Sequence, residues 1–123
     1  MRKALLLVVT LAAGPASAAG IENFSVRTAA DLVALCSADP ASDTYTAAIH
    51  FCQGFGVGAY QYYLAQTGED PSSQYVCLPN PPPTRNEAMA AFVAWANAHP
   101  EYMDNSPVDA IFRYLGETYP CKR

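Results

Sequence analysis

The sequence predicts an all-α fold, a small disulfide-stapled bundle of about four helices. Apolar residues recur at helical spacing in four segments, and residues that cap helices precede these segments. The cysteines form an even set, and no segment shows the sustained apolar–polar alternation of a half-buried strand. With 123 residues, 51% of them hydrophobic and 15% charged, the chain has room for one compact domain.

Residues 1–19 have the pattern of a secretory signal peptide. Arg2 and Lys3 precede an apolar run of about eleven residues, which is shorter than the roughly 20 residues that a membrane-spanning helix needs. Ala16 and Ala18 supply the small residues of a cleavage site; the alternative is an uncleaved membrane anchor. We therefore expect residues 20–123 to form the folded domain and to lie in the periplasm, free of the membrane after cleavage.

The charge balance of residues 20–123 argues against two classes of partner. This part holds five basic and eleven acidic residues, a formal net charge of −6. Nucleic acids and anionic lipid surfaces are bound through Lys and Arg, so neither is expected as a partner. A protein partner with a cationic patch is compatible with the charge, which also serves solubility alone.

Four cysteines, Cys36, Cys52, Cys77 and Cys121, lie in the mature part. In a small exported chain an even count predicts two disulfides, with reactive thiols or metal ligands as the alternative. The sequence has no Cys-x-x-Cys pair, and its two histidines have no zinc-like spacing to the cysteines. We expect no metal and no cofactor. Four cysteines permit three pairings.

Capping residues set the boundaries of the expected helices. After an extended segment at 21–27, Thr28 begins a helix over about 29–36, and Asp43 begins a long one that ends near Gly68. Thr84 begins a helix to about 98, and Ser106 begins the last one at 107. The last two would form an antiparallel hairpin. This layout favours the pairs Cys36–Cys52 and Cys77–Cys121.

Gly54 and Gly58 lie inside the long helix, where each glycine costs about 0.8 to 1 kcal/mol relative to alanine. They are four residues apart and share one face. We expect them to let another backbone pack closely against the helix. Ligand cradling and a helix kink are the alternatives.

Four residues are the predicted partner-binding set: Tyr62, Tyr75, Leu78 and Asn80. Tyr62 lies off the buried face of the long helix, and exposed tyrosines are frequent in protein interfaces. The other three belong to a proline-rich loop that a disulfide at Cys77 would hold against the body. Loops positioned by a rigid scaffold commonly carry binding function. Ordinary partial burial of the tyrosines is the alternative.

No arrangement of residues predicts catalysis, and we name no catalytic residue. His50 has the chemistry of a general base, but no nucleophile setting such as Gly-x-Ser-x-Gly accompanies it. His99 stands before Pro100 at a helix end, where it suits the last carbonyl groups. The alternative is an enzyme with a polar cleft around His50.

Five segments in this order resemble the Rap/Tai family of type VI secretion immunity proteins: 31–36 (DLVALC), 51–58 (FCQGFGVG), 76–79 (VCLP), 95–101 (WANAHPE) and 119–121 (YPC). The resemblance implies an all-helical, disulfide-bonded periplasmic protein, commonly a homodimer. It also implies a partner, a secreted peptidoglycan amidase whose active-site groove is blocked. The alternative function is that of a periplasmic stress or chaperone-like helical protein without a toxin partner.

Overall fold

The computed structural model describes residues 19–122, so the predicted signal peptide at 1–19 lies outside the described residues except for Ala19. The fold consists of four α-helices, α1 (Ala29–Cys36), α2 (Tyr45–Thr67), α3 (Arg85–Ala98) and α4 (Pro107–Thr118). Three short 3-10 helices accompany them, η1 (Ile21–Ser25), η2 (Pro71–Ser73) and η3 (Pro100–Tyr102). Within 19–122 no strand forms, and Val76 and Pro120 make an isolated β-bridge. The predicted all-α class is confirmed.

The N-termini of α1, α3 and α4 form as the capping residues predict. The side chains of Thr28, Thr84 and Ser106 each accept a hydrogen bond from the backbone N–H three residues later, at 3.3, 3.2 and 3.2 Å. In α3 the Glu87 carboxylate also accepts from the Thr84 N–H at 2.7 Å, which completes a capping box. Local chemistry therefore fixes where these three helices begin.

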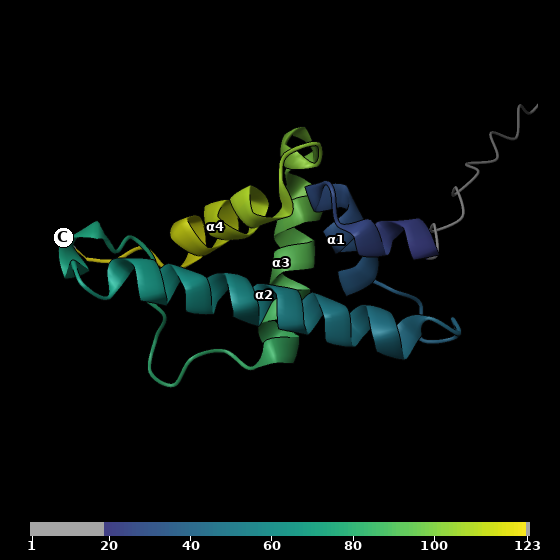
Figure 1. The fold of residues 1–123 in the computed structure, drawn as a ribbon, viewed down its shortest axis with the longest axis horizontal. Coiled ribbons are helices and arrows are strands. Elements are labelled where there is room, and N and C mark those ends of the chain that lie inside the picture. Colours follow the sequence, from purple (N-terminus) through teal and green to yellow (C-terminus); the bar gives the residue numbers. More distant parts are fainter. Residues whose placement is uncertain (1–18, 123) are drawn as a thin grey trace, which may run out of the picture.

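Three local predictions are corrected. Thr44, not Asp43, is the N-cap of α2, and its side chain makes no capping hydrogen bond. Residues 21–25 form η1 rather than an extended segment, because Asn23 accepts from the Gly20 N–H at 2.8 Å and closes a tight turn. Finally, α4 leaves η3 obliquely and does not run back along α3 as an antiparallel hairpin (Figure 1).

The long helix α2 spans the molecule, with α1 beside its first half and α3 crossing it (Figure 1). The α1 helix packs against α2, α3 and α4, so it contacts every other α-helix of the described residues. The main core combines residues from all four helices and from the segment before α3. Its largest members are Leu32, Tyr63, Val76, Phe92, Ile111, Tyr114 and Leu115.

Two disulfides connect the elements in the favoured pairing. Cys36–Cys52 joins the end of α1 to α2, with Cα atoms 5.2 Å apart. Cys77–Cys121 joins the segment after η2 to the segment after α4, with Cα atoms 4.8 Å apart. Among the described residues, no helix combines the length and apolar character needed to cross a membrane.

Candidate functional site: a groove and a pinned loop

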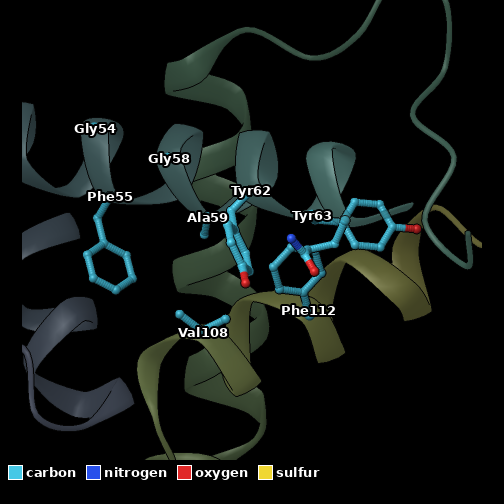
Figure 2. Close-up of a pocket in the computed structure, with 9 residues that line it drawn as sticks. Gly54, Phe55, Gly58, Ala59, Tyr62, Tyr63, Val108 and Phe112 are labelled. Carbon is cyan, nitrogen blue, oxygen red and sulfur yellow. The ribbon is translucent and has the colours of Figure 1, made fainter. Parts of the chain in front are cut away.

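An open apolar groove lies between α2 and α4, with a volume of about 600 Å³ (Figure 2). Tyr62 and Val108 stand at its edge and are 67% and 43% exposed. Both side chains therefore present apolar surface that no other residue of 19–122 covers. We call this feature the α2–α4 groove; its lining includes Gly54, Phe55, Gly58, Ala59, Tyr62, Val108 and Phe112.

The close packing predicted at Gly54 and Gly58 does not occur within residues 19–122. A Cβ atom built on either glycine would meet no atom within 4 Å, and both glycines line the open α2–α4 groove (Figure 2). The physical reason is that α4 meets α2 further along, where the Tyr63 and Phe112 ring centroids are 5.1 Å apart. The backbone of α4 consequently never reaches the two glycines.

Tyr63 holds the start of the loop that follows η2. Its buried hydroxyl accepts hydrogen bonds from two consecutive backbone N–H groups, Tyr75 at 2.8 Å and Val76 at 3.0 Å. The Cys77 N–H then donates to the Tyr119 carbonyl at 2.8 Å, next to the Cys77–Cys121 disulfide. Residues 75–77 are thus fixed on α2 and on the C-terminal segment, and the chain beyond them starts from a rigid point.

The structure divides the four predicted partner-binding residues between two faces. Tyr62 lines the α2–α4 groove, and Tyr75 lies near it, with its ring centroid 6.3 Å from that of Phe112. Leu78 and Asn80 belong instead to the proline loop, which we define as residues 78–83. Leu78 is half-buried against the core and Asn80 is exposed. Partner binding by these residues remains a prediction.

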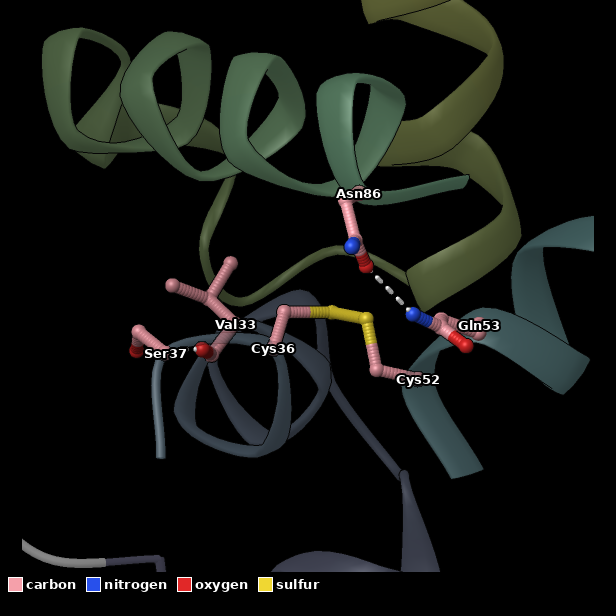
Figure 3. The surroundings of a disulfide bond; sticks show 6 residues. All are labelled: Val33, Cys36, Ser37, Cys52, Gln53 and Asn86. Atoms are coloured by element: carbon pink, nitrogen blue, oxygen red, sulfur yellow. Dashed lines mark hydrogen bonds between the residues drawn. A yellow bond between two sulfur atoms is a disulfide. The ribbon is translucent and has the colours of Figure 1, made fainter. Parts of the chain in front are cut away.

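A second pocket, of about 320 Å³, lies under the proline loop. One side of it includes the Cys36–Cys52 disulfide and Gln53, whose side chain donates a hydrogen bond to Asn86 at 2.8 Å (Figure 3). This bond connects α2 to the first turn of α3. We call this cavity the loop pocket; its lining includes Gly56, Val57, Tyr60, Leu78, Pro83, Arg85, Met89, Phe92 and Tyr114.

Sequence reasoning missed Val108 and Phe112, which form the α4 side of the groove. The buried stripe of α4 consists of Ala110, Ile111, Tyr114 and Leu115. Val108 and Phe112 are four residues apart on a neighbouring stripe. Two apolar residues at helical spacing outside the core stripe were the signal that could have revealed the groove.

The residues around the end of α3 form an aromatic cluster with a structural role. The His99 ring stacks on Trp95 at 4.5 Å, and His99 Nδ1 lies 2.7 Å from the Trp95 carbonyl oxygen, as its helix-end position predicts. Arg113 lies over the Tyr102 ring and pairs with Asp109 at 2.8 Å. This hydrogen bond from Arg113, with another from Asn105, lowers the pKa of Asp109.

His50 is exposed on α2 and makes no hydrogen bond to any residue of 19–122. Across the same residues, no three His, Cys, Asp or Glu side chains are grouped so that they could hold a metal ion. What the described surface does offer is two apolar recesses and a pinned loop, which suit binding rather than bond chemistry.

The part of the chain that carries both recesses and the proline loop matches a known protein family. The family model for Rap1a immunity proteins matches residues 28–121, which include all four helices and both disulfides. The chain belongs to the Rap1a immunity protein family. Searches of curated proteins and of solved structures found no match. Membership in an immunity family indicates an inhibitor of a toxin rather than an enzyme, so the functional site of this Rap1a-family protein is a protein-binding surface.

Proposed function

We propose that this Rap1a-family protein binds and inhibits a peptidoglycan amidase toxin in the periplasm. The observation that carries the proposal is the family match over residues 28–121. The resemblance of the five sequence segments to type VI secretion immunity proteins supports the amidase as the target. Disulfides in a small domain suit an oxidising compartment, which supports the periplasm.

Two surfaces are suited to contact the toxin. The proline loop begins directly after residues 75–77, which Tyr63 and the Cys77–Cys121 disulfide hold in place. A toxin that binds this loop would therefore restrict little further motion, so the loss of conformational entropy on binding is small. The α2–α4 groove presents the exposed side chains of Tyr62 and Val108 beside a floor without side chains at Gly54 and Gly58. Aromatic residues beside an apolar recess are typical of the energetic centre of an interface.

A protection experiment in cells tests both the activity and the compartment. A secreted amidase that is a candidate for the cognate toxin is directed to the periplasm of a host cell, together with either the full chain or a version without residues 1–19. The full chain is expected to prevent lysis and the shortened one to fail, because only an exported inhibitor meets the toxin. Lysis in the presence of the exported, folded full chain would contradict the proposal.

The contribution of the groove can be tested by one substitution and a matched control. Tyr62→Glu places a charge on the groove edge, while Ile21→Glu places one on η1, where Ile21 is 79% exposed. Tyr62→Glu is expected to weaken amidase binding at least tenfold, the loss typical of a central interface aromatic. Ile21→Glu is expected to bind normally. Equal affinities for the two variants would exclude the groove from the interface.

The resemblance also supports a homodimer as part of the proposal. The α2–α4 groove is an apolar surface on which a second copy could pack. Sedimentation of the processed protein measures its oligomeric state directly. A dimer that Tyr62→Glu dissociates would place the groove in the dimer interface, and a monomer at all concentrations would remove this part of the proposal.

A further inference from the structure

The loop pocket has the size and wall chemistry of a small-molecule site. Its volume of about 320 Å³ lies at the lower end of the roughly 300 to 1,000 Å³ found for such sites. The walls are apolar on three sides: Val57 from α2, Met89 and Phe92 from α3, and Leu78 from the proline loop. An apolar group placed here would be shielded from water on every side except the open one.

Among the described residues, Arg85 is the only charged one that lines the pocket. It is exposed at the first position of α3, and it forms no ion pair with any residue of 19–122. The nearest acid along the helix, Glu87, is engaged by the Thr84 N–H at 2.7 Å. Arg85 therefore brings to the pocket a positive charge that no described acidic side chain pairs, although the domain as a whole is acidic.

Tyr114 adds an aromatic wall to the pocket. The residue is 4% exposed, and its hydroxyl is buried on the side of Tyr119, which does not line the pocket. Burial, with a smaller effect of the neighbouring Tyr119, raises the pKa of Tyr114 to about 12. The hydroxyl consequently stays neutral and able to donate.

We infer that the loop pocket binds an amphipathic monocarboxylate, with its alkyl chain against Val57, Met89 and Phe92 and its carboxylate at Arg85. The length follows from the volume, because about 320 Å³ at roughly 30 Å³ per small group holds about ten non-hydrogen atoms. A saturated fatty acid of eight to ten carbons meets both requirements. This binding is separate from toxin inhibition and does not depend on it.

Decanoate is the probe, and Trp95 is the reporter. Trp95 is the only tryptophan of the chain, and its ring stacks on Phe92 with centroids 6.4 Å apart. Titration of the processed protein with decanoate is expected to change the fluorescence of Trp95 saturably, with one decanoate bound per chain by calorimetry. Decanol and decylamine have the same chain without the carboxylate and are expected to bind more weakly.

Three variants localise the binding. Arg85→Gln is expected to weaken decanoate binding about three- to fivefold, the effect of an exposed charge pair, and to leave decanol binding unchanged. Arg27→Gln removes the same charge outside the pocket and is expected to have no effect. Met89→Trp fills the pocket and is expected to abolish binding. Circular dichroism and intact disulfides confirm that each variant is folded.

Several outcomes would overturn the inference. Equal affinity for decanoate and decanol, or an equal loss in Arg85→Gln and Arg27→Gln, would remove the carboxylate from the recognition. Unchanged binding in a folded Met89→Trp variant would place decanoate elsewhere. If decanoate does not bind and the Met89→Trp variant no longer binds the amidase, the pocket accepts a toxin side chain instead of a fatty acid.

Discussion

Tyr63 is the residue on which the position of the proline loop depends. Replacing it with Phe keeps the ring but leaves the N–H groups of Tyr75 and Val76 without their acceptor, and that of Val76 is buried. An unsatisfied buried donor costs about 1–3 kcal/mol. We predict that Tyr63→Phe lowers the free energy of unfolding by this amount in urea denaturation and accelerates hydrogen exchange at Val76.

Tyr62→Phe is the matched control for this prediction. Tyr62 is the adjacent tyrosine of α2, is 67% exposed, and its hydroxyl makes no hydrogen bond to the described residues. Its substitution is expected to leave stability within about 0.5 kcal/mol of the original protein. If the two variants unfold at the same urea concentration, Tyr63 does not hold the loop.

Asp31 links the stability of α1 to pH. Hydrogen bonds from the Asn23 side chain and from the backbone N–H groups of Arg27 and Thr28 lower the pKa of Asp31 in the folded state. The unfolded chain holds this proton more tightly, so the stabilisation is complete above the ordinary pKa near 4 and is lost as the pH falls through the lowered folded value. We predict that Asp31→Asn flattens this acid part of the curve of Tm against pH.

Asp43→Asn provides the control, because the Asp43 carboxylate makes no hydrogen bond to any residue of 19–122. The acid part of the curve of Tm against pH should be the same for this variant as for the original protein. The same titration bears on the chaperone-like alternative, since an acid-activated chaperone would expose apolar surface and bind a fluorescent dye as the pH falls. An Asp31→Asn curve as steep as the original would contradict the assigned role of Asp31.

In α2, the glycines of the groove floor are expected to limit helix stability. A Cβ atom at Gly54 or Gly58 meets no atom within 4 Å, so alanine gains its helix propensity of about 0.8–1 kcal/mol at each position without a clash. We predict that Gly54→Ala and Gly58→Ala each raise the free energy of unfolding of the isolated domain by about this amount.

Gly68→Ala is the comparison at the end of α2. A Cβ atom there would lie 3.0 Å from the Leu64 carbonyl oxygen, so this variant is expected to gain less stability than the other two. Destabilisation by Gly54→Ala or Gly58→Ala at high protein concentration only would show that a second chain approaches the glycines. Destabilisation at every concentration would contradict the open floor seen in the structure.

The beginnings of α1, α3 and α4 could be predicted because capping is a local property. A hydroxyl three residues before an accessible N–H is sufficient, as Thr84 and Ser106 show. The start of α2 was missed because its N-cap, Thr44, makes no side-chain capping bond. The role of Gly54 was missed for a different reason: what faces a helix depends on tertiary structure, and α4 meets α2 further along.

The candidate site was predictable in part. The exposure of Tyr62 follows from its angle on α2, and the loop after η2 follows from its prolines and Cys77. The division of the four predicted residues between two faces could not be derived, because it depends on the path of the chain around Tyr63. The lining role of Arg85 was missed because the proline loop, folded over α3, creates the pocket.

Across the whole molecule, the two disulfides are expected to contribute unequally to stability. Their partners are 16 and 44 residues apart in sequence. In the chain-entropy model, loops of these lengths correspond to about 3 and about 4 kcal/mol. We predict that the double variant Cys77→Ser/Cys121→Ser loses more free energy of unfolding than Cys36→Ser/Cys52→Ser.

Amidase binding should separate the two disulfide variants further. Cys77–Cys121 holds the start of the proline loop, whereas Cys36–Cys52 joins two core helices. Where both variants are still folded by circular dichroism, the first is expected to bind the amidase more weakly and the second normally. The opposite order would mean that the pinned loop is not part of the toxin interface.

Titration of a purified amidase with the processed protein tests the central claim most directly. The amidase is a secreted candidate for the cognate toxin, and the measurement is its release of peptide from peptidoglycan at fixed enzyme concentration. We predict that hydrolysis falls linearly and stops when the immunity protein reaches a fixed stoichiometric ratio, while the Tyr62→Glu protein requires a large excess. Full hydrolysis at micromolar concentrations of the folded, disulfide-bonded protein would contradict the account.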